Sequence, residues 1–355
     1  MSTVHSDTIK IDGRPIGRGN PPYIIAELSG NHNGNIERAL ALIDAAHASG
    51  ADAVKLQTYT ADTLTIDYDG PGFQISEGLW KGRSLYELYQ EAHTPWDWHE
   101  RLFSRARKLG ITMFSSPFDV TAIDLLEELE TPAYKIASFE AIDIPLIERT
   151  AATGKPLIIS TGMATLEEIE EALAAARRTG TGEIALLHCV SGYPTPIEES
   201  NLHTINDLRN RFDVVIGLSD HTSGITVPIA SIALGASIIE KHFTLSRDDG
   251  GPDAKFSLEP DELTSLCKEC KNAWLALGNV NYARKNSEQT NAIFRRSLYV
   301  VEDIAKGELF NANNIRSIRP GHGVAPKYLP EFIGKTARTS LKKGTPLAID
   351  HIKQE

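Results

Sequence analysis

The feature that most constrains the fold is a repeated alternation, from residue 23 to about residue 280, of short β-branched runs with longer amphipathic segments. The runs with the continuous apolar character of buried parallel strands are Tyr23–Glu27, Ala53–Gln57, Thr112–Ser116, Ala133–Ile136, Pro156–Ser160, Ile184–His188, Val214–Leu218 and Ser237–His242. Helical patterns lie at Ile36–Ser49, Asp119–Leu129, Leu166–Arg177, Ile225–Leu234 and Asp261–Leu277. This order predicts an α/β protein built on a closed (β/α)₈ TIM barrel. A doubly wound open sheet is the alternative, but it usually has fewer strands, and no GxGxxG motif follows the first run.

Two additions interrupt the barrel pattern. Residues 9–16 read as a hairpin that turns at Asp12-Gly13, and we expect it to cap the barrel floor. The segment Ala61–Trp98 is an insertion rich in Gly, Tyr and Trp that follows the second strand. Because loops that follow barrel strands lie at the mouth of the active site, we expect this insertion to shape the substrate pocket.

The chain is expected to contain two domains. Residues 1–280 form the hairpin and barrel, residues 281–293 a polar linker, and residues 294–355 a small domain with short strands at Ser297–Val301 and Pro346–Ile349. A domain of this size has little core of its own, so we expect it to pack on another surface.

Composition limits the classes of partner and the cellular compartment. The 355-residue chain has a formal net charge of −11, which argues against nucleic acid as a partner. No apolar run reaches the roughly 20 residues of a membrane span, and residues 1–10 do not resemble a signal peptide. Cys189, Cys267 and Cys270 cannot make a disulfide framework. Cys267 and Cys270 are interpreted as reduced thiols, with a structural zinc site as the alternative, and a cytoplasmic protein is expected.

Two lysines stand among apolar residues inside predicted strands. An ammonium group buried at Lys55 or Lys135 without a partner would be desolvated at a cost of several kcal/mol. Each therefore requires an anion, either a protein carboxylate or a ligand. Serines end several of the strands, and although a single strand-end serine is more often a helix cap, two lysines with several serines favour a phosphate or carboxylate site.

Two histidines end neighbouring strands. His221 and His242 meet at the barrel mouth, where two imidazoles can bind a divalent cation, or can instead be histidines satisfied within the core. Asp220 or Glu240 is a candidate for orienting them. Glu27 faces the same opening and is a candidate acid or base.

At these residues the sequence resembles the sialic acid synthase family, which condenses phosphoenolpyruvate with an amino-sugar aldose. The matching strings are AELSGNHNG (26–34), VKLQT (54–58), YKIAS (134–138), STGM (160–163), HCVSGYPTP (188–196), GLSDHT (217–222), EKHFT (240–244) and GPD (251–253). They follow the family's order along nearly the whole chain. Residues 305–321 resemble the family's antifreeze-like (SAF) domain, which in the family reaches across a homodimer to cover the partner's barrel.

The resemblance implies a role for each matched residue. Glu27 corresponds to the acidic catalytic residue, and His221 and His242 correspond to the pair that binds Mn²⁺ or Mg²⁺, with Co²⁺ as a further candidate. The residues implied for phosphoenolpyruvate are Lys55, Ser116, Lys135, Ser138, Ser160, Ser191 and Ser219. Sialate synthases usually carry asparagine at the position of Ser191. The residues implied for the acceptor sugar are Asn31, Gln57, Glu140, Tyr193, Asp253, Phe256 and Arg319. Arg319 corresponds to an arginine that the partner subunit supplies in a domain-swapped homodimer.

Residues 114–119 and 250–260 resemble the pseudaminic acid synthases most closely. Sialate synthases tend to have His-Lys after Gly-Pro-Asp, where this chain has Ala254. The expected acceptor is therefore 2,4-diacetamido-2,4,6-trideoxy-L-altrose, and an apolar Phe256 beside the sugar would suit its missing hydroxyl. The alternatives are an N-acetylneuraminate or legionaminate synthase and, in another class, a non-catalytic sugar-binding protein.

Overall fold

The computed structural model describes residues 8–180 and 182–354, and the chain divides into two compact units, the first ending at Gly278 and the second beginning at Asn279. Residues 1–7, which carry most of the prediction about a signal peptide, lie outside the described part. No helix among the described residues has the length and apolar character that crossing a membrane requires.

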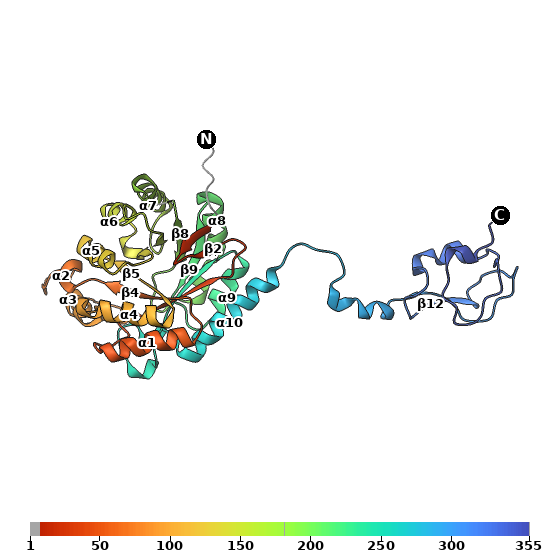
Figure 1. Cartoon of the computed structure of the whole chain (residues 1–355), viewed down its shortest axis with the longest axis horizontal. Helices are drawn as coiled ribbons and strands as arrows, with labels where there is room; N and C mark the ends of the chain where they lie inside the picture. Colours follow the sequence, from red (N-terminus) through yellow and green to blue (C-terminus); the bar gives the residue numbers. More distant parts are fainter. Residues whose placement is uncertain (1–7, 181, 355) are drawn as a thin grey trace. The chain divides into compact units, whose positions relative to one another are not determined.

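Within the described residues of the first unit, eight parallel strands close into a barrel, which confirms the predicted fold (Figure 1). Their order around the barrel is β10-β3-β4-β5-β6-β7-β8-β9. The strands are β3 (Tyr23–Glu27), β4 (Ala53–Thr58), β5 (Thr112–Pro117), β6 (Tyr134–Ile136), β7 (Leu157–Ser160), β8 (Ile184–Cys189), β9 (Val215–Asp220) and β10 (Ile238–His242). Each predicted run matches its strand to within two residues at either end, because both faces of every strand are buried and leave an uninterrupted apolar signal.

Helices form the outer layer of the barrel (Figure 1). They are α1 (Ile36–Ala48), α4 (His99–Leu109), α5 (Val120–Glu128), α6 (Ile144–Ala151), α7 (Leu166–Thr179), α8 (His203–Phe212), α9 (Thr226–Ala233) and α10 (Pro260–Leu277). The five predicted helices correspond to α1, α5, α7, α9 and α10. Gly110 shows how such a helix stops, since its φ of 77° ends α4 in the left-handed conformation just before β5.

The strands separate the barrel unit into two cores. Successive side chains point to opposite faces, so Ile24 and Ala26 join the large core between strands and helices, whereas Tyr23 and Ile25 join a smaller core inside the barrel. The inner core is apolar only at the amino-terminal ends of the strands. The inner face towards the carboxyl ends is therefore left for polar residues.

A hairpin closes the amino-terminal end of the barrel, as predicted. Strands β1 (Thr8–Ile11) and β2 (Arg14–Gly17) pair antiparallel around a turn at Asp12-Gly13. Ile9, Ile11 and Ile16 are each at most 1% exposed and belong to the inner core. Their burial excludes water from that end of the barrel and leaves the carboxyl ends as its mouth.

The insertion after β4 has secondary structure of its own. It contains α2 (Ala61–Leu64) and α3 (Leu85–Ala92), and residues 73–85 fold back on themselves between the two helices. Ser84 caps α3 by accepting from the Glu87 backbone N–H, while the Glu87 side chain accepts from the Ser84 N–H.

The second unit has a small core around Leu298, Phe310 and Phe332, each fully buried. Its elements are β11 (Ser297–Val300), β12 (Ile315–Ile318) and α11 (Leu329–Phe332). The predicted strand at Pro346–Ile349 is wrong. Pro346 makes only an isolated bridge to Tyr299, and Ile349 begins a 3₁₀ turn. The pairing goes no further because Val324 comes between the two segments: the Leu298 N–H donates to the Val324 carbonyl, and the Val324 N–H donates to the Leu347 carbonyl.

Candidate active site

The register of the barrel brings the predicted residues together. Glu27 at the end of β3 pairs with Lys55 on one side and with His242 on the other. Glu240 pairs with Ser219 in the same way. Directly paired residues share a face of the sheet, so these side chains converge on the inner face at the carboxyl ends of the strands.

A cavity of about 490 Å³ lies over this end of the barrel. The predicted residues that line it are Glu27, Lys55, Gln57, Lys135, Ser138, Glu140, Tyr193, Ser219, His221, His242 and Asp253. Its volume suits small-molecule ligands, and polar groups converge at one end of it.

Four charged side chains alternate in sign at the base of the cavity. Lys55 Nζ forms an ion pair with Glu27 and lies 3.8 Å from Glu240 Oε2, while Lys135 Nζ lies 2.9 Å from Glu240 Oε1. All four residues are at most 4% exposed. Burial alone would lower the pKa of Lys135 and raise that of Glu240, but their mutual attraction outweighs burial and shifts both in the opposite direction. Lys135 is therefore a cation held by Glu240, and Lys55 is paired with the carboxylates of Glu27 and Glu240.

Two of the predicted serines form hydrogen bonds with this charge cluster. Lys55 donates to Ser116 Oγ at 3.3 Å, and Ser219 donates to Glu240 at 3.2 Å. The hydroxyls of Ser160 and Ser191 are buried and have no hydrogen-bond partner among the described residues. Unsatisfied buried hydroxyls are uncommon in proteins, and here they leave donors free for a ligand.

Gly162 is needed where two of these serines approach the backbone. A Cβ at Gly162 would lie 2.3 Å from Ser191 Oγ and 2.7 Å from Ser138 Oγ, distances that a real side chain cannot adopt. The glycine therefore lets both hydroxyls pack beside the end of β7.

The two histidines are adjacent, as predicted. Their ring centroids are 5.4 Å apart, and His221 Nδ1 lies 2.9 Å from the Val190 carbonyl, which can only accept, so Nε2 is the acceptor in the neutral form of the ring. His242 Nδ1 is buried and has no hydrogen-bond partner in the part of the chain that the structure describes, and it lies 3.8 Å from Asp253 Oδ2. Burial, followed by the His221 ring and the lysines, holds the pKa of His242 well below its usual value.

These donors fit a divalent cation. A neutral imidazole is the form that binds metal, and His242 has a lone pair available while His221 is oriented by Val190. Asp253 adds a carboxylate beside them. In the chain as described, no three His, Cys, Asp or Glu side chains are grouped closely enough to make a ligand set alone, so water or substrate would complete the shell.

Glu27 is held by several donors. Its Oε1 accepts from the Ser29 backbone N–H and from Gln57 Nε2, each at 3.0 Å, and Lys55 pairs with the other oxygen. The Ser29 hydroxyl donates to Asp253, which joins this group to the 250–253 loop. Burial, together with the Glu27 charge, raises the pKa of Asp253 to about 6.

Two of the predicted sugar-binding residues of the first unit, Asn31 and Phe256, do not line the cavity. The Asn31 amide donates to Phe243 O and Ser257 Oγ, both at 2.9 Å, so it stabilises a loop. Phe256 is 2% exposed, and its ring packs 4.9 Å from that of His242, so its place beside the sugar stays a prediction. Arg319 belongs to the second unit, where it is exposed.

Sequence reasoning missed part of the site. It treated Glu240 only as a candidate for orienting the histidines, whereas Glu240 is the carboxylate between the two lysines. It also did not identify the insertion residues that line the cavity, which are Leu64, Ile75, Glu77, Trp80, Leu85, Leu88, Tyr89 and Ala92. The available signal was the aromatic content of the insertion, but no periodicity indicates which of its side chains face inward.

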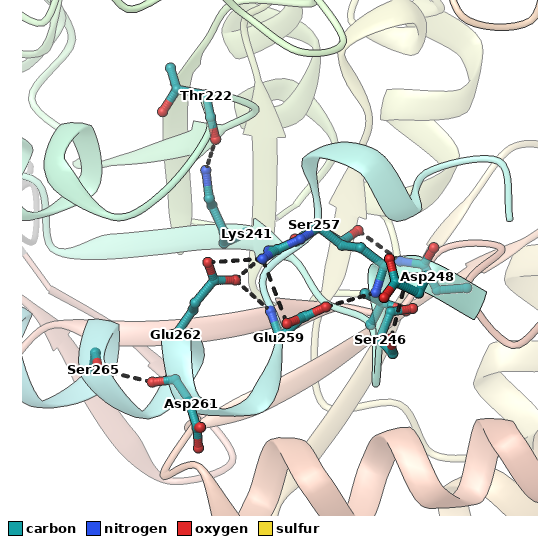
Figure 2. A network of polar contacts seen from close by, with 12 residues as sticks. Thr222, Lys241, Ser246, Asp248, Ser257, Glu259, Asp261, Glu262 and Ser265 are labelled. Atoms are coloured by element: carbon teal, nitrogen blue, oxygen red, sulfur yellow. Dashed lines mark hydrogen bonds and ion pairs between the residues drawn. The ribbon is translucent and has the colours of Figure 1, made fainter. Parts of the chain in front are cut away.

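Behind the histidines, on the outer face of the barrel, lies a second buried ion pair. Lys241 Nζ is 2.5 Å from Asp220 Oδ2. It also donates to the Thr222 carbonyl, as Figure 2 shows. Because side chains alternate along a strand, Lys241 points away from the cavity while Glu240 and His242 point into it. The ion pair joins β9 to β10 directly behind the two histidines.

A further network anchors the loop that carries Asp253. Arg247 pairs with Glu259 and Glu262 at the start of α10. Glu262 accepts from the Glu259 N–H at 2.9 Å (Figure 2). Both ends of the 247–259 loop are therefore held against the first turn of α10.

On α10, Cys267 and Cys270 lie one turn apart. Burial raises the pKa of both thiols to about 12, which keeps them protonated.

Comparison with known proteins places this architecture among characterised relatives. The NeuB family matches residues 42–282, and the SAF domain matches residues 295–353. The pseudaminic acid synthase of Helicobacter pylori is 46% identical over 94% of this chain and 98% of its own length. An N,N'-diacetyllegionaminic acid synthase of Campylobacter jejuni is 40% identical over 90% of this chain and 97% of its own. The crystal structure of the N-acetylneuraminic acid synthetase of Leptospira borgpetersenii, in complex with citrate, superposes with a TM-score of 0.73 at 34% identity, covering 81% of this chain and 95% of that one.

Replacing Lys241 with methionine should strongly destabilise the barrel, because Asp220 would be left buried and without its cation. Breaking one side of a buried pair typically costs about 3–5 kcal/mol, which urea denaturation would register as a lower midpoint. The double variant Lys241→Met with Asp220→Asn should recover part of the loss. An unchanged midpoint in the single variant would show that the pair does not hold the strands.

Glu140 should make the free energy of unfolding depend on pH. Burial raises its pKa from 4.5 to about 7, with Lys135 opposing the shift. The folded state then binds the Glu140 proton more tightly than the unfolded state does. The contribution of the protonated side chain to the free energy of unfolding is therefore complete below pH 4.5 and is lost as the pH rises to 7. Comparing urea midpoints of the wild type and Glu140→Gln between pH 4.5 and 8 tests this. Parallel curves would contradict it.

Proposed function

This chain belongs to the NeuB family and carries a SAF domain, and from that membership we propose that it condenses phosphoenolpyruvate with an amino-sugar aldose. The products are a nonulosonic acid and phosphate. We assign pseudaminic acid as the product and 2,4-diacetamido-2,4,6-trideoxy-L-altrose as the acceptor. Pseudaminic acid synthases that are 44–46% identical to the chain support this choice over the legionaminate synthases at 35–40%.

The observation that carries the proposal is the buried Glu27–Lys55–Glu240–Lys135 cluster beside the two histidines. Phosphoenolpyruvate has a carboxylate and a phosphate, and two fixed ammonium groups with free serine hydroxyls suit both anions. The lysines act by preorganised electrostatic positioning and need no change of protonation.

The reaction joins C3 of phosphoenolpyruvate to the aldehyde carbon of the open-chain sugar, and positive character develops at C2. Water adds to C2, and the resulting tetrahedral hemiketal phosphate loses phosphate by C–O cleavage, which leaves the keto acid. His221 and His242 would hold Mn²⁺, Mg²⁺ or Co²⁺, and such an ion supplies Lewis-acid polarisation of the aldehyde oxygen.

We assign Glu27 the role of the base that takes a proton from the water that adds to C2. Ser29, Gln57 and Lys55 direct three donors at its oxygens, which holds the carboxylate in one orientation beside the lysines. A positioned carboxylate of this kind contributes about 10²–10⁴-fold to a proton-transfer step.

We expect phosphate release from phosphoenolpyruvate when the protein is mixed with Mn²⁺ and the pseudaminate precursor. The assay compares this sugar with the legionaminate precursor and with N-acetylmannosamine. Release with N-acetylmannosamine alone would overturn the pseudaminate assignment, and no release with any sugar would favour a non-catalytic sugar-binding protein. Glu27→Gln is the matched control, since it keeps the shape of the side chain and should lower kcat at least about 100-fold.

We also propose that the working enzyme is a cytoplasmic homodimer in which the SAF domain of one chain, through Arg319, completes the partner's barrel. Glu27→Gln and Arg319→Ala should each be inactive alone. Unfolding and refolding an equal mixture should restore about a quarter of the wild-type rate, because half of the dimers are mixed and each mixed dimer has one intact site. If refolded samples that are shown to contain mixed dimers recover no activity, the proposal that the partner's SAF domain completes the barrel is wrong.

A further inference from the structure

The insertion after β4 gives the cavity a wall unlike its base. Leu64, Ile75, Trp80 and Leu85 line the cavity from this segment, whereas the strand ends contribute lysines and serines to it. Glu77 is the only charged residue that the insertion adds to the described lining. The cavity therefore has a charged end and an apolar side.

The wall is built as an ordered structure. The Ile75 N–H donates to the Arg83 carbonyl at 2.9 Å, and the Gly82 N–H donates to the Ile75 carbonyl at 2.8 Å, so residues 75–83 form a closed turn. The Leu85 N–H donates to the Phe73 carbonyl at 2.9 Å and ties the start of α3 to this turn. Ile75 and Leu85 are thus presented from a fixed backbone.

Trp80 connects the wall to the loop that carries Asp253. Its indole N–H donates to the Pro252 carbonyl at 2.9 Å, and its ring lies 5.7 Å from the ring of Tyr193. Pro252 also packs closely against Gly30, since a Cβ added at Gly30 would lie 2.8 Å from Pro252 Cγ. The position of the indole is therefore coupled to the same loop that places Asp253 next to Ser29 and His242.

We propose that this wall, formed by Ile75, Trp80 and Leu85, is an apolar subsite that selects an acceptor sugar bearing methyl groups in place of hydroxyls. The inference rests on the proposed function and deepens it. The acceptor proposed above carries a C6 methyl and two acetamido methyls, and its aldehyde end must reach the charged base where phosphoenolpyruvate binds. The remainder of the sugar then lies along the insertion. Trp80 acts as a positioning residue that holds the wall in a fixed position relative to the Asp253 loop.

The size of the effect follows from the chemistry of the wall. A methyl group against apolar side chains is favoured over a hydroxyl, which would lose its water and find no partner at Ile75 or Leu85. A difference of one such group in an apolar pocket changes kcat/KM by about tenfold or more.

The test compares two acceptors, the 6-deoxy sugar and its analogue with a hydroxyl on C6, by the ratio of their kcat/KM values in the phosphate-release assay. Wild type should favour the 6-deoxy sugar by about tenfold. Ile75→Thr and Leu85→Asn should bring the ratio towards one and leave the KM for phosphoenolpyruvate unchanged. Trp80→Phe keeps a ring but loses the bond to Pro252, and it should raise the KM for both sugars more than it lowers kcat.

Ile66→Thr is the matched control, because Ile66 lies in the same insertion, is 59% exposed and does not line the cavity. It should keep the wild-type ratio, and thermal melts of all variants check that they fold. If wild type uses the 6-deoxy sugar but Ile75→Thr and Leu85→Asn keep the same ratio as Ile66→Thr, the subsite is wrong and the proposed function stands. If wild type releases phosphate with neither sugar, the proposed function fails and the subsite with it.

Discussion

The buried pairing of Lys55 and Lys135 with Glu27 and Glu240 is the interaction on which the active end of the barrel depends. Two ammonium groups cannot be taken out of water without compensation, and each lysine here lies within 4 Å of a carboxylate. The four residues come from β3, β4, β6 and β10, so the cluster exists only when the barrel is closed. Closure of the sheet and assembly of the charged base are therefore one event.

The two faces of each strand have different roles, one in packing and one in the site. On β10, Ile239 and Lys241 face the helices while Glu240 and His242 face the cavity. The outer ion pair of Lys241 with Asp220 stabilises the strands directly behind the histidines, and the hairpin residues Ile9 and Ile16 seal the opposite end. A rigid shell of this kind holds the side chains of the site in fixed positions with respect to one another.

The cavity combines this shell with a less regular insertion. The strand ends supply charge and hydrogen bonds for a small anion, whereas the insertion supplies Ile75, Trp80 and Leu85 on an apolar side. Two chemically different ends suit an enzyme that must bind two different substrates in one place. The bond from Trp80 to Pro252 joins the insertion to the loop that carries Asp253, so the two ends are mechanically connected.

The sequence by itself determined the barrel, the hairpin and most of the residues at the mouth. Strands buried on both faces leave apolar runs that are visible without a structure, and polar residues at the ends of those runs must meet in a closed barrel. Only the tertiary structure decided that Glu240 bridges the two lysines, that Phe256 packs behind His242, and that Trp80 reaches Pro252. These contacts join residues far apart in the chain and depend on register, side-chain direction and loop conformation, which local sequence patterns do not encode.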